Sequence, residues 1–154
     1  MNKSRLENLI NYIDKAFQKN AGLWSHSVLD ILEKVSVKEA IWKGEKVNSI
    51  WEIVNHLISG KEYIISLLEG REPSEEDFKI PEKPSEEEWK NTIEKLKNSH
   101  KKLIDLLKYK NDEDLERPFG EYGTLEENLY GIISHDCYHV GQIVILLQLM
   151  GVEV

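Results

Sequence analysis

The sequence predicts an all-α protein, a bundle of four main helices forming one domain over residues 1–154. Three observations support this prediction. The length of 154 residues suits one domain with one core. Apolar residues recur at three- and four-residue spacing, and no stretch alternates with the period of two typical of strands. Three of the four prolines fall within residues 73–84, so the rest of the chain is almost free of helix breakers.

The sequence pattern in the first third of the chain predicts one long helix and two short ones. The long helix covers about residues 3–19, where the apolar side chains from Leu6 to Phe17 share a face. A shorter segment follows around SVLDILEK (27–34), and SVKE (36–39) then opens one or two more turns with a capping box.

Three longer helices each begin with the pattern Ser/Thr-x-x-Glu, in which the hydroxyl and the carboxylate satisfy free N–H groups at the helix start. The three pairs are Ser49 with Glu52, Ser85 with Glu88, and Thr124 with Glu127. The helices are expected to end near residues 69, 109 and 150, with Gly70 as the stop of the first.

The connector GREPSEEDFKIPEKP (70–84) indicates how the helices are ordered. Fully extended, it could span roughly 50 Å at about 3.3 Å per residue. The preceding helix is only roughly 31 Å long at about 1.5 Å per residue. Such a connector can cross the whole bundle, so we expect the second and third main helices to be parallel, in an up-down-down-up arrangement.

Composition argues against several function classes. The 20 Lys and Arg against 28 Asp and Glu give a formal net charge of -8, which is unfavourable for binding nucleic acid or anionic lipid. A single cysteine, Cys137, allows no intramolecular disulfide. The chain shows neither a signal peptide nor a membrane span, so we expect a cytoplasmic protein with no membrane partner.

The stretch SHDCYHVGQIVILLQLMG (134–151) combines an apolar stripe with three polar residues. His135, His139 and Gln142 share one helix face, and apolar residues continue that face into the bundle. Imidazoles four residues apart can close on one ion at about 2.0–2.1 Å. The competing interpretation is a chance pair of partly exposed histidines. Gln142 could orient a bound water or a ligand imidazole, or simply bond to the backbone.

His56 is the candidate third ligand, because its helix also turns it inward. A core histidine bonded to a neighbouring carbonyl or hydroxyl is the alternative. Gly60 and Gly131 each lie four residues from a candidate ligand. A glycine costs roughly 1 kcal/mol in a helix relative to alanine, so either room for a pocket or close helix packing is expected at both positions.

Other residues are weaker candidates for the pocket. Glu52 is the only carboxylate expected near a metal, although its role in a capping box competes. Tyr63 and Tyr138 could line a pocket or pack at its edge. His26 could lie at a pocket rim, whereas His100, flanked by lysines, is expected at the solvent-exposed surface.

The order of SIWEIVNHL and HDCYHVGQI along the chain resembles the DinB-like (YfiT-like) metalloenzyme superfamily of bacterial helical bundles. The resemblance covers nearly the whole chain, including GLWSHSVLDILEKVSVKEA. It implies an up-down-down-up bundle that holds a divalent metal, commonly nickel or zinc, on three histidines. These correspond to His56, His135 and His139, with solvent or substrate completing the coordination. Many relatives are dimeric, so a homodimer is also implied.

Two functions follow as hypotheses. Characterised branches of the resembled superfamily include transferases and isomerases that use low-molecular-weight thiols such as bacillithiol or mycothiol, and others are described as hydrolases. The first hypothesis is therefore a metal-dependent S-transferase or hydrolase acting on a small molecule, with a thiol cosubstrate in the former case. The alternative is a non-catalytic metal- or ligand-binding bundle that serves as an interaction or stress-response module.

Overall fold

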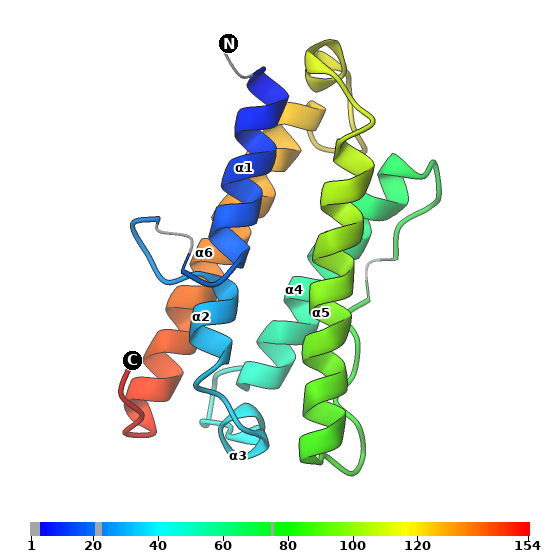
Figure 1. Cartoon of the computed structure of the whole chain (residues 1–154). Helices are drawn as coiled ribbons and strands as arrows, with labels where there is room; N and C mark the ends of the chain where they lie inside the picture. The colour runs from blue at the N-terminus through cyan, green and yellow to red at the C-terminus, as the bar shows by residue number, and fades with distance from the viewer. Residues whose placement is uncertain (1–3, 21–22, 75) are drawn as a thin grey trace.

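The structure is a computed structural model that describes residues 4–20, 23–74 and 76–154 (Figure 1). Four long helices form the bundle: α1 (Arg5–Phe17), α4 (Ile50–Leu68), α5 (Glu86–Leu107) and α6 (Leu125–Leu149). The short elements are α2 (Val28–Leu32), α3 (Val37–Ile41) and the 3-10 helix η1 (Asp112–Glu116). No described residue belongs to a strand. The predicted all-helical bundle is confirmed; residue 3, the expected start of the first helix, lies outside the described residues.

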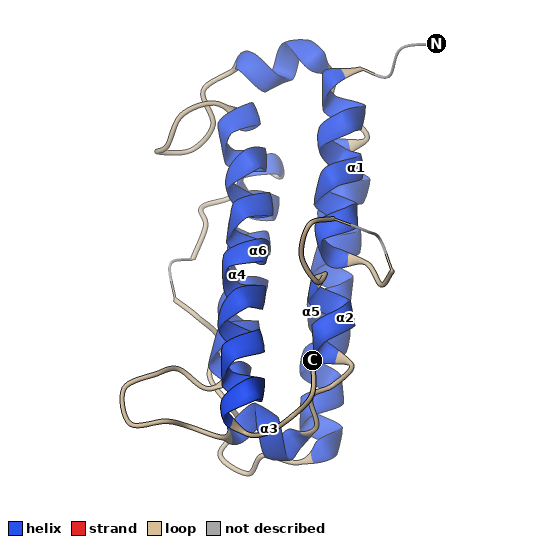
Figure 2. Cartoon of the chain, turned by 90° about the vertical axis from the view of Figure 1, so that its left-hand side faces the viewer, coloured by secondary structure: helices blue, strands red, loops and turns tan. Residues whose placement is uncertain are grey.

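The long helices pack as a ring. α6 contacts both α1 and α4, and α5 contacts both α4 and α1. The colours of Figure 1 show that α4 and α5 run in one direction while α1 and α6 run in the other, and Figure 2 shows the same bundle from the side. The connector after α4 passes back along the outside of the bundle to the start of α5 (Figure 1). This places α4 and α6 side by side with opposite directions.

Local signals in the sequence account for most helix ends. Complete capping boxes form at the starts of α3, α4 and α6. At α5, Ser85 accepts the Glu88 N–H, but the expected return bond from Ser85 N–H to the Glu88 side chain does not form. Gly70 ends α4 with a φ of 70°, and Arg71 N–H donates to Ser66 O at 2.8 Å, as in a Schellman motif.

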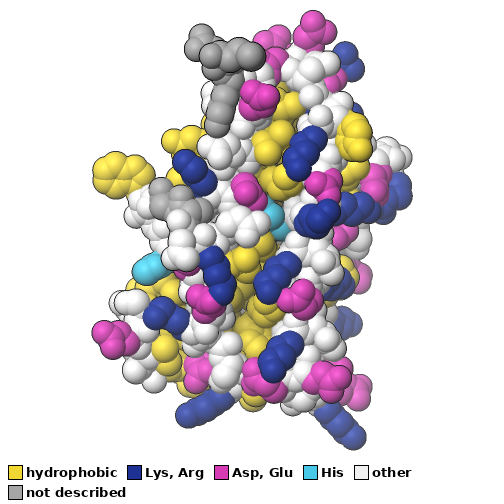
Figure 3. Space-filling model, in the orientation of Figure 1, with side chains coloured by type: hydrophobic (Ala, Val, Ile, Leu, Met, Phe, Trp, Pro, Cys, Tyr) yellow, Lys and Arg dark blue, Asp and Glu magenta, His cyan; other side chains and the backbone are white. Residues whose placement is uncertain are grey.

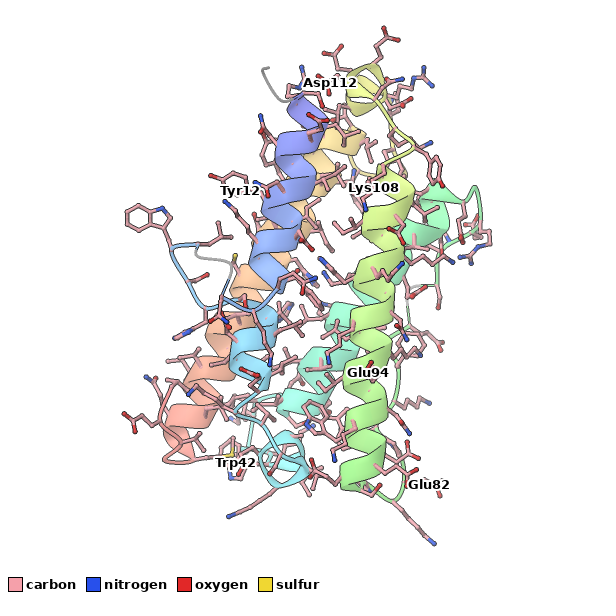
Figure 4. The ribbon with its side chains drawn as sticks, viewed as in Figure 1. Tyr12, Trp42, Glu82, Glu94, Lys108 and Asp112 are labelled. Carbon is pink, nitrogen blue, oxygen red and sulfur yellow. The ribbon has the colours of Figure 1, made fainter. Side chains whose placement is uncertain are left out.

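The start of α1 is held by a residue distant in sequence. The carboxylate of Asp112, labelled in Figure 4, accepts the backbone N–H groups of Arg5 at 3.0 Å and Leu6 at 2.9 Å. These are free donors of the first helical turn, and a carboxylate there also suits the helix dipole. The η1 segment thereby fixes one end of α1 against the rest of the bundle.

The core consists of two hydrophobic clusters. One, around Trp51 and Trp89, fills the end of the bundle near α3, and its indole rings contact each other edge-on at 5.1 Å. The other fills the end near η1. On the face of α1 and α5, hydrophobic side chains form a strip between charged ones (Figure 3). No helix among the described residues is long and apolar enough to cross a membrane.

A buried polar layer lies between the two clusters. It includes Lys61, Asp136 and His100, each flanked along its helix by members of both clusters. The Lys61 ammonium contacts the Asp136 carboxylate at 2.8 Å, and their side chains are 0% and 1% exposed. Burying two charges is costly unless they are paired, so this ion pair joins α4 to α6 at a defined register.

The expectation that His100 lies at the surface is wrong. His100 is 1% exposed, its ring stacks on Phe17 at 3.8 Å, and its Nε2 lies 2.9 Å from Asp14 Oδ1. The adjacent lysines point elsewhere because neighbouring helical residues are turned by about 100°. His100 instead shares its face with Leu96 and Leu103, which are buried.

Candidate metal centre

Three histidine side chains meet where α4 faces α6. His56 comes from α4, and His135 and His139 come from α6, one turn apart. One ring nitrogen from each lies within 4.8 Å of the other two, so the group could hold a metal ion. We call these three residues the histidine cluster. The fold thus brings together the three histidines singled out in the sequence.

The geometry of the histidine cluster fits a divalent ion. Two nitrogens that each lie about 2.0–2.1 Å from a tetrahedral ion are about 3.3 Å apart. The Nε2 atoms of His56 and His135 are 3.0 Å apart. Ring centroids lie 4.5 to 4.9 Å apart with interplanar angles of 54° to 80°, so the rings surround a common centre. Among the described residues the group contains no fourth protein ligand, which leaves room for solvent or substrate.

Hydrogen bonds hold the outer nitrogens of two of these rings. His56 Nδ1 lies 2.9 Å from Oδ2 of Asp77, and His139 Nδ1 lies 2.6 Å from Oε1 of Gln142. Both oxygens accept, so each Nδ1 donates and the neutral ring keeps a lone pair on Nε2. Ligand histidines in metal sites typically make this kind of outer bond. Gln142 therefore lies where it can orient a ligand imidazole.

Burial favours the uncharged form of the two α6 histidines. Burial, together with the nearby His139 and His56, lowers the pKa of His135 to about 4. Burial also lowers the pKa of His139, although the bond to Gln142 opposes the shift. Neutral imidazole is the form that binds metal ions, so both rings are in the ligating form at neutral pH.

Gly60 provides the space that His135 occupies. A Cβ at Gly60 would lie 3.0 Å from Cε1 and 3.3 Å from Nδ1 of His135. That Nδ1 is buried and has no hydrogen-bond partner among the described residues, so packing positions the ring. Gly131 differs, because a Cβ there would meet no heavy atom within 4 Å. Close packing therefore explains Gly60 but not Gly131.

A groove beside the histidine cluster has a volume of about 730 Å³. Its walls come from α4 at Gly60 and Ile64 and from α6 between Glu127 and His135, and residues 121–123 line one end. We call it the α4/α6 groove. Because His135 belongs both to its wall and to the histidine cluster, the groove leads to the candidate metal position.

Glu52 is occupied elsewhere. Its carboxylate accepts hydrogen bonds from the Lys43 ammonium at 2.6 Å and from the Ser49 N–H at 2.7 Å. Although burial acts in the opposite direction, these bonds hold the pKa of Glu52 below its usual value. The capping role considered from the sequence is therefore the observed one.

The remaining candidates differ in their distance from the histidine cluster. Tyr138 lies beside it, with its ring edge-on to His139 at 5.0 Å and its side chain 65% exposed at the rim. The Tyr63 hydroxyl instead approaches Gly120, within the hydrophobic cluster near η1. His26 is exposed in a separate surface hollow next to Trp24.

Sequence reasoning missed two features of the centre. Asp77 lies in the connector after α4, which has no regular secondary structure, so no helical repeat predicts where its side chain lies. The Lys61–Asp136 pair joins the two helices beside Gly60 and His135. Here a signal existed, because both charges interrupt stripes of apolar residues, and buried charges are rare unless paired.

A family model described as the DinB superfamily matches residues 24–143. No curated protein matches the chain. No solved structure matches it either.

Proposed function

The chain belongs to the DinB superfamily, and on that premise we propose that it is a divalent-metal-dependent enzyme acting on a small molecule, with His56, His135 and His139 as ligands. The observation that carries the proposal is the convergence of three imidazoles, two of which have Nδ1 bonded away from the centre. Imidazole nitrogens suit nickel and zinc, the two metals we propose.

The chain's own residues would prepare the site. Asp77 and Gln142 fix the orientation of two ligand rings, and Gly60 leaves the space for the third. The His56 side chain is 44% exposed and Asp77 is 48% exposed, so small molecules can reach this side of the centre. A divalent ion with an open position would lower the pKa of a bound water to about 7 or stabilise a bound thiolate.

The proposed reaction is a thiol-dependent S-transfer or a hydrolysis. Among the described residues the group of candidate ligands consists of the three histidines, without a cysteine, and the Asp77 carboxylate that contacts it is bonded to His56 Nδ1. Cys137 is turned toward Ser25, with Sγ and Oγ 4.0 Å apart. The nucleophile would therefore be supplied from outside the chain, either as water in a hydrolase or as a low-molecular-weight thiol in a transferase.

A non-catalytic binding bundle is the second candidate. It is favoured by the engagement of Glu52 with Lys43 and Ser49, because the carboxylate expected nearest to the metal is then not free to act as a base. Such a protein would bind the metal and a small ligand without turnover.

Turnover assays test the proposal. The metal-loaded protein is assayed with electrophiles and a panel of low-molecular-weight thiols, and with ester and amide substrates without thiol. We expect activity that is lost on chelation and in His139→Ala, and retained in His26→Ala, which changes an exposed histidine outside the cluster. Metal binding without turnover on any substrate would favour the binding bundle.

We also propose a homodimer. Its support is the exposed side of α6, where Tyr138, Ile145 and Leu149 are 65%, 56% and 67% exposed. Light scattering after gel filtration should give twice the chain mass of 17.9 kDa, whereas a monomer at micromolar concentration would contradict it.

A further inference from the structure

The α4/α6 groove has the size of a small-molecule site. Its volume of about 730 Å³ lies within the range of roughly 300–1,000 Å³ typical of ligand pockets. From Glu127 to His135 it follows eight residues of α6, which corresponds to about 12 Å at about 1.5 Å per residue. A ligand of that length would reach from the end of the groove at residues 121–123 to the histidine cluster.

The middle of the groove is apolar and open. Ile64 and Ile132 lie on its two sides and are 4% and 5% exposed. Gly131 lies between the groove's ends, and a Cβ there would meet nothing within 4 Å. A larger side chain at Gly131 would therefore enter the groove rather than clash with the protein. This section suits a hydrocarbon body.

The end of the groove away from the histidines is acidic. Glu121 and Glu127 line it, and no Lys or Arg does. Among the described residues neither carboxylate takes part in an ion pair, and Glu127 uses only Oε2, which accepts the Thr124 N–H at 2.7 Å in the capping box of α6. Tyr122, which is 71% exposed, lies between them in sequence and also lines this end. Carboxylates and an aromatic ring together favour a cation.

We propose that the α4/α6 groove binds a small organic cation, with its ammonium group between Glu121, Tyr122 and Glu127 and its apolar body on Ile64 and Ile132. The charge of the groove disfavours a ligand with a carboxylate at this end. The other end of the ligand lies against His135, so its role as a substrate rests on the proposed function, whereas its binding does not.

The probe is hexylamine, an apolar chain with one ammonium group. Its binding to the protein as purified, and again after loading with zinc, is measured by NMR titration. Hexanoate and hexanol are the matched probes with the opposite charge and no charge. We expect hexylamine to bind at least about tenfold more tightly than hexanoate. Equal binding of the two, or tighter binding of hexanoate, would overturn the proposal.

Two variants locate the site. Gly131→Leu should fill the groove and abolish hexylamine binding without loss of stability, since the position is exposed and leucine favours helix. Glu121→Gln with Glu127→Gln should weaken binding about tenfold, since one exposed charge pair contributes up to about fivefold. Glutamine at 127 preserves the capping box.

Glu87→Gln is the matched control, an exposed carboxylate at the start of α5, and should leave binding unchanged. Unaltered hexylamine affinity in Gly131→Leu would refute the location.

The same samples separate this inference from the proposed function. Metal content is determined for each. A protein that holds metal but shows no preference for hexylamine refutes the cation site and leaves the metal site standing. A protein that binds hexylamine in the groove but holds no metal refutes the proposed function and leaves the cation site standing.

Discussion

The buried ion pair between Lys61 and Asp136 provides the sharpest test of the bundle's energetics. Nζ and Oδ2 are 2.8 Å apart, and the two side chains are 0% and 1% exposed. Asp136 Oδ1 has no hydrogen-bond partner among the described residues. The pair is thus fully buried and incompletely satisfied. The perturbations are Lys61→Met, Asp136→Leu and the double variant.

Each single change leaves one buried charge without its partner. This costs about 3–5 kcal/mol, because the remaining ion cannot regain its hydration. At about 2–4 °C per kcal/mol for a chain of this size, the melting temperature should fall by about 6–20 °C. The double variant removes both charges, and hydrophobic replacement of a buried pair is often neutral or stabilising. We therefore expect it to recover most of the loss.

Urea unfolding of the four proteins gives the interaction energy as a double-mutant cycle. The control is the exposed pair of Lys101 and Asp105, with an N–O distance of 2.6 Å and side chains 77% and 45% exposed. Its cycle should give no more than about 0.5 kcal/mol. The reasoning is refuted if Lys61→Met costs less than about 1 kcal/mol, or if the double variant loses the sum of the single losses.

Three further predictions concern the centre and its surroundings. Gly60→Ala should lower metal affinity by displacing His135, because the new Cβ would lie 3.0 Å from Cε1; isothermal titration with zinc measures this, and unchanged affinity would contradict it. Asp77→Asn should weaken metal binding about 10- to 100-fold with little change in the unfolding free energy of the metal-free protein. A variant whose metal-free form is also strongly destabilised would indicate a structural role for Asp77 instead. Burial, with the nearby Lys61 charge, lowers the pKa of His100 to about 4, against about 6.5 in the unfolded chain. The unfolded state therefore takes up a proton first, so His100 should contribute a fall of roughly 3 kcal/mol in the unfolding free energy between pH 6.5 and 4, in addition to the fall that the lowered pKa of His135 causes. His100→Gln should flatten this slope in urea titrations, and a slope identical to wild type would exclude His100 as its source.

Much of the fold could be predicted because its signals are local. The expected helix at residues 49–69 is α4 (Ile50–Leu68), and the expected helix at 124–150 is α6 (Leu125–Leu149). Both begin with complete capping boxes. At Ser85 the same pattern yields only one of the two bonds, because Ser85 accepts the Glu88 N–H while the return bond to the Glu88 carboxylate is absent.

The histidine cluster could be predicted because helical periodicity places His135 and His139 on one side of α6 and His56 on the side of α4 that faces it, although His56 stays 44% exposed. His100 is buried although two lysines follow it, because its position along the helical repeat and not its adjacent residues decides which side of α5 it occupies. Residues Leu96 and Leu103, on the same face, indicate burial.

Asp77 could not be predicted, because its position depends on the path of a connector. Its bond to His56 joins two residues 21 apart in the chain through a segment without regular structure. Contacts of this kind depend on tertiary packing, which no short sequence pattern encodes. The Lys61–Asp136 pair could be predicted only in part. Each charged residue interrupts a stripe of apolar residues on its own helix, which indicates a buried charge, but only the fold shows that the two side chains meet.

Metal binding by the purified protein tests the central claim most directly. We predict about one nickel or zinc ion per chain by elemental analysis, its loss in His139→Ala and its retention in His26→Ala. Metal at 100 times its dissociation constant should stabilise the fold by about 2.7 kcal/mol, which raises the melting temperature by about 5–11 °C. A protein that holds no metal after growth in supplemented medium, and whose melting temperature does not change with zinc or nickel, would contradict the account.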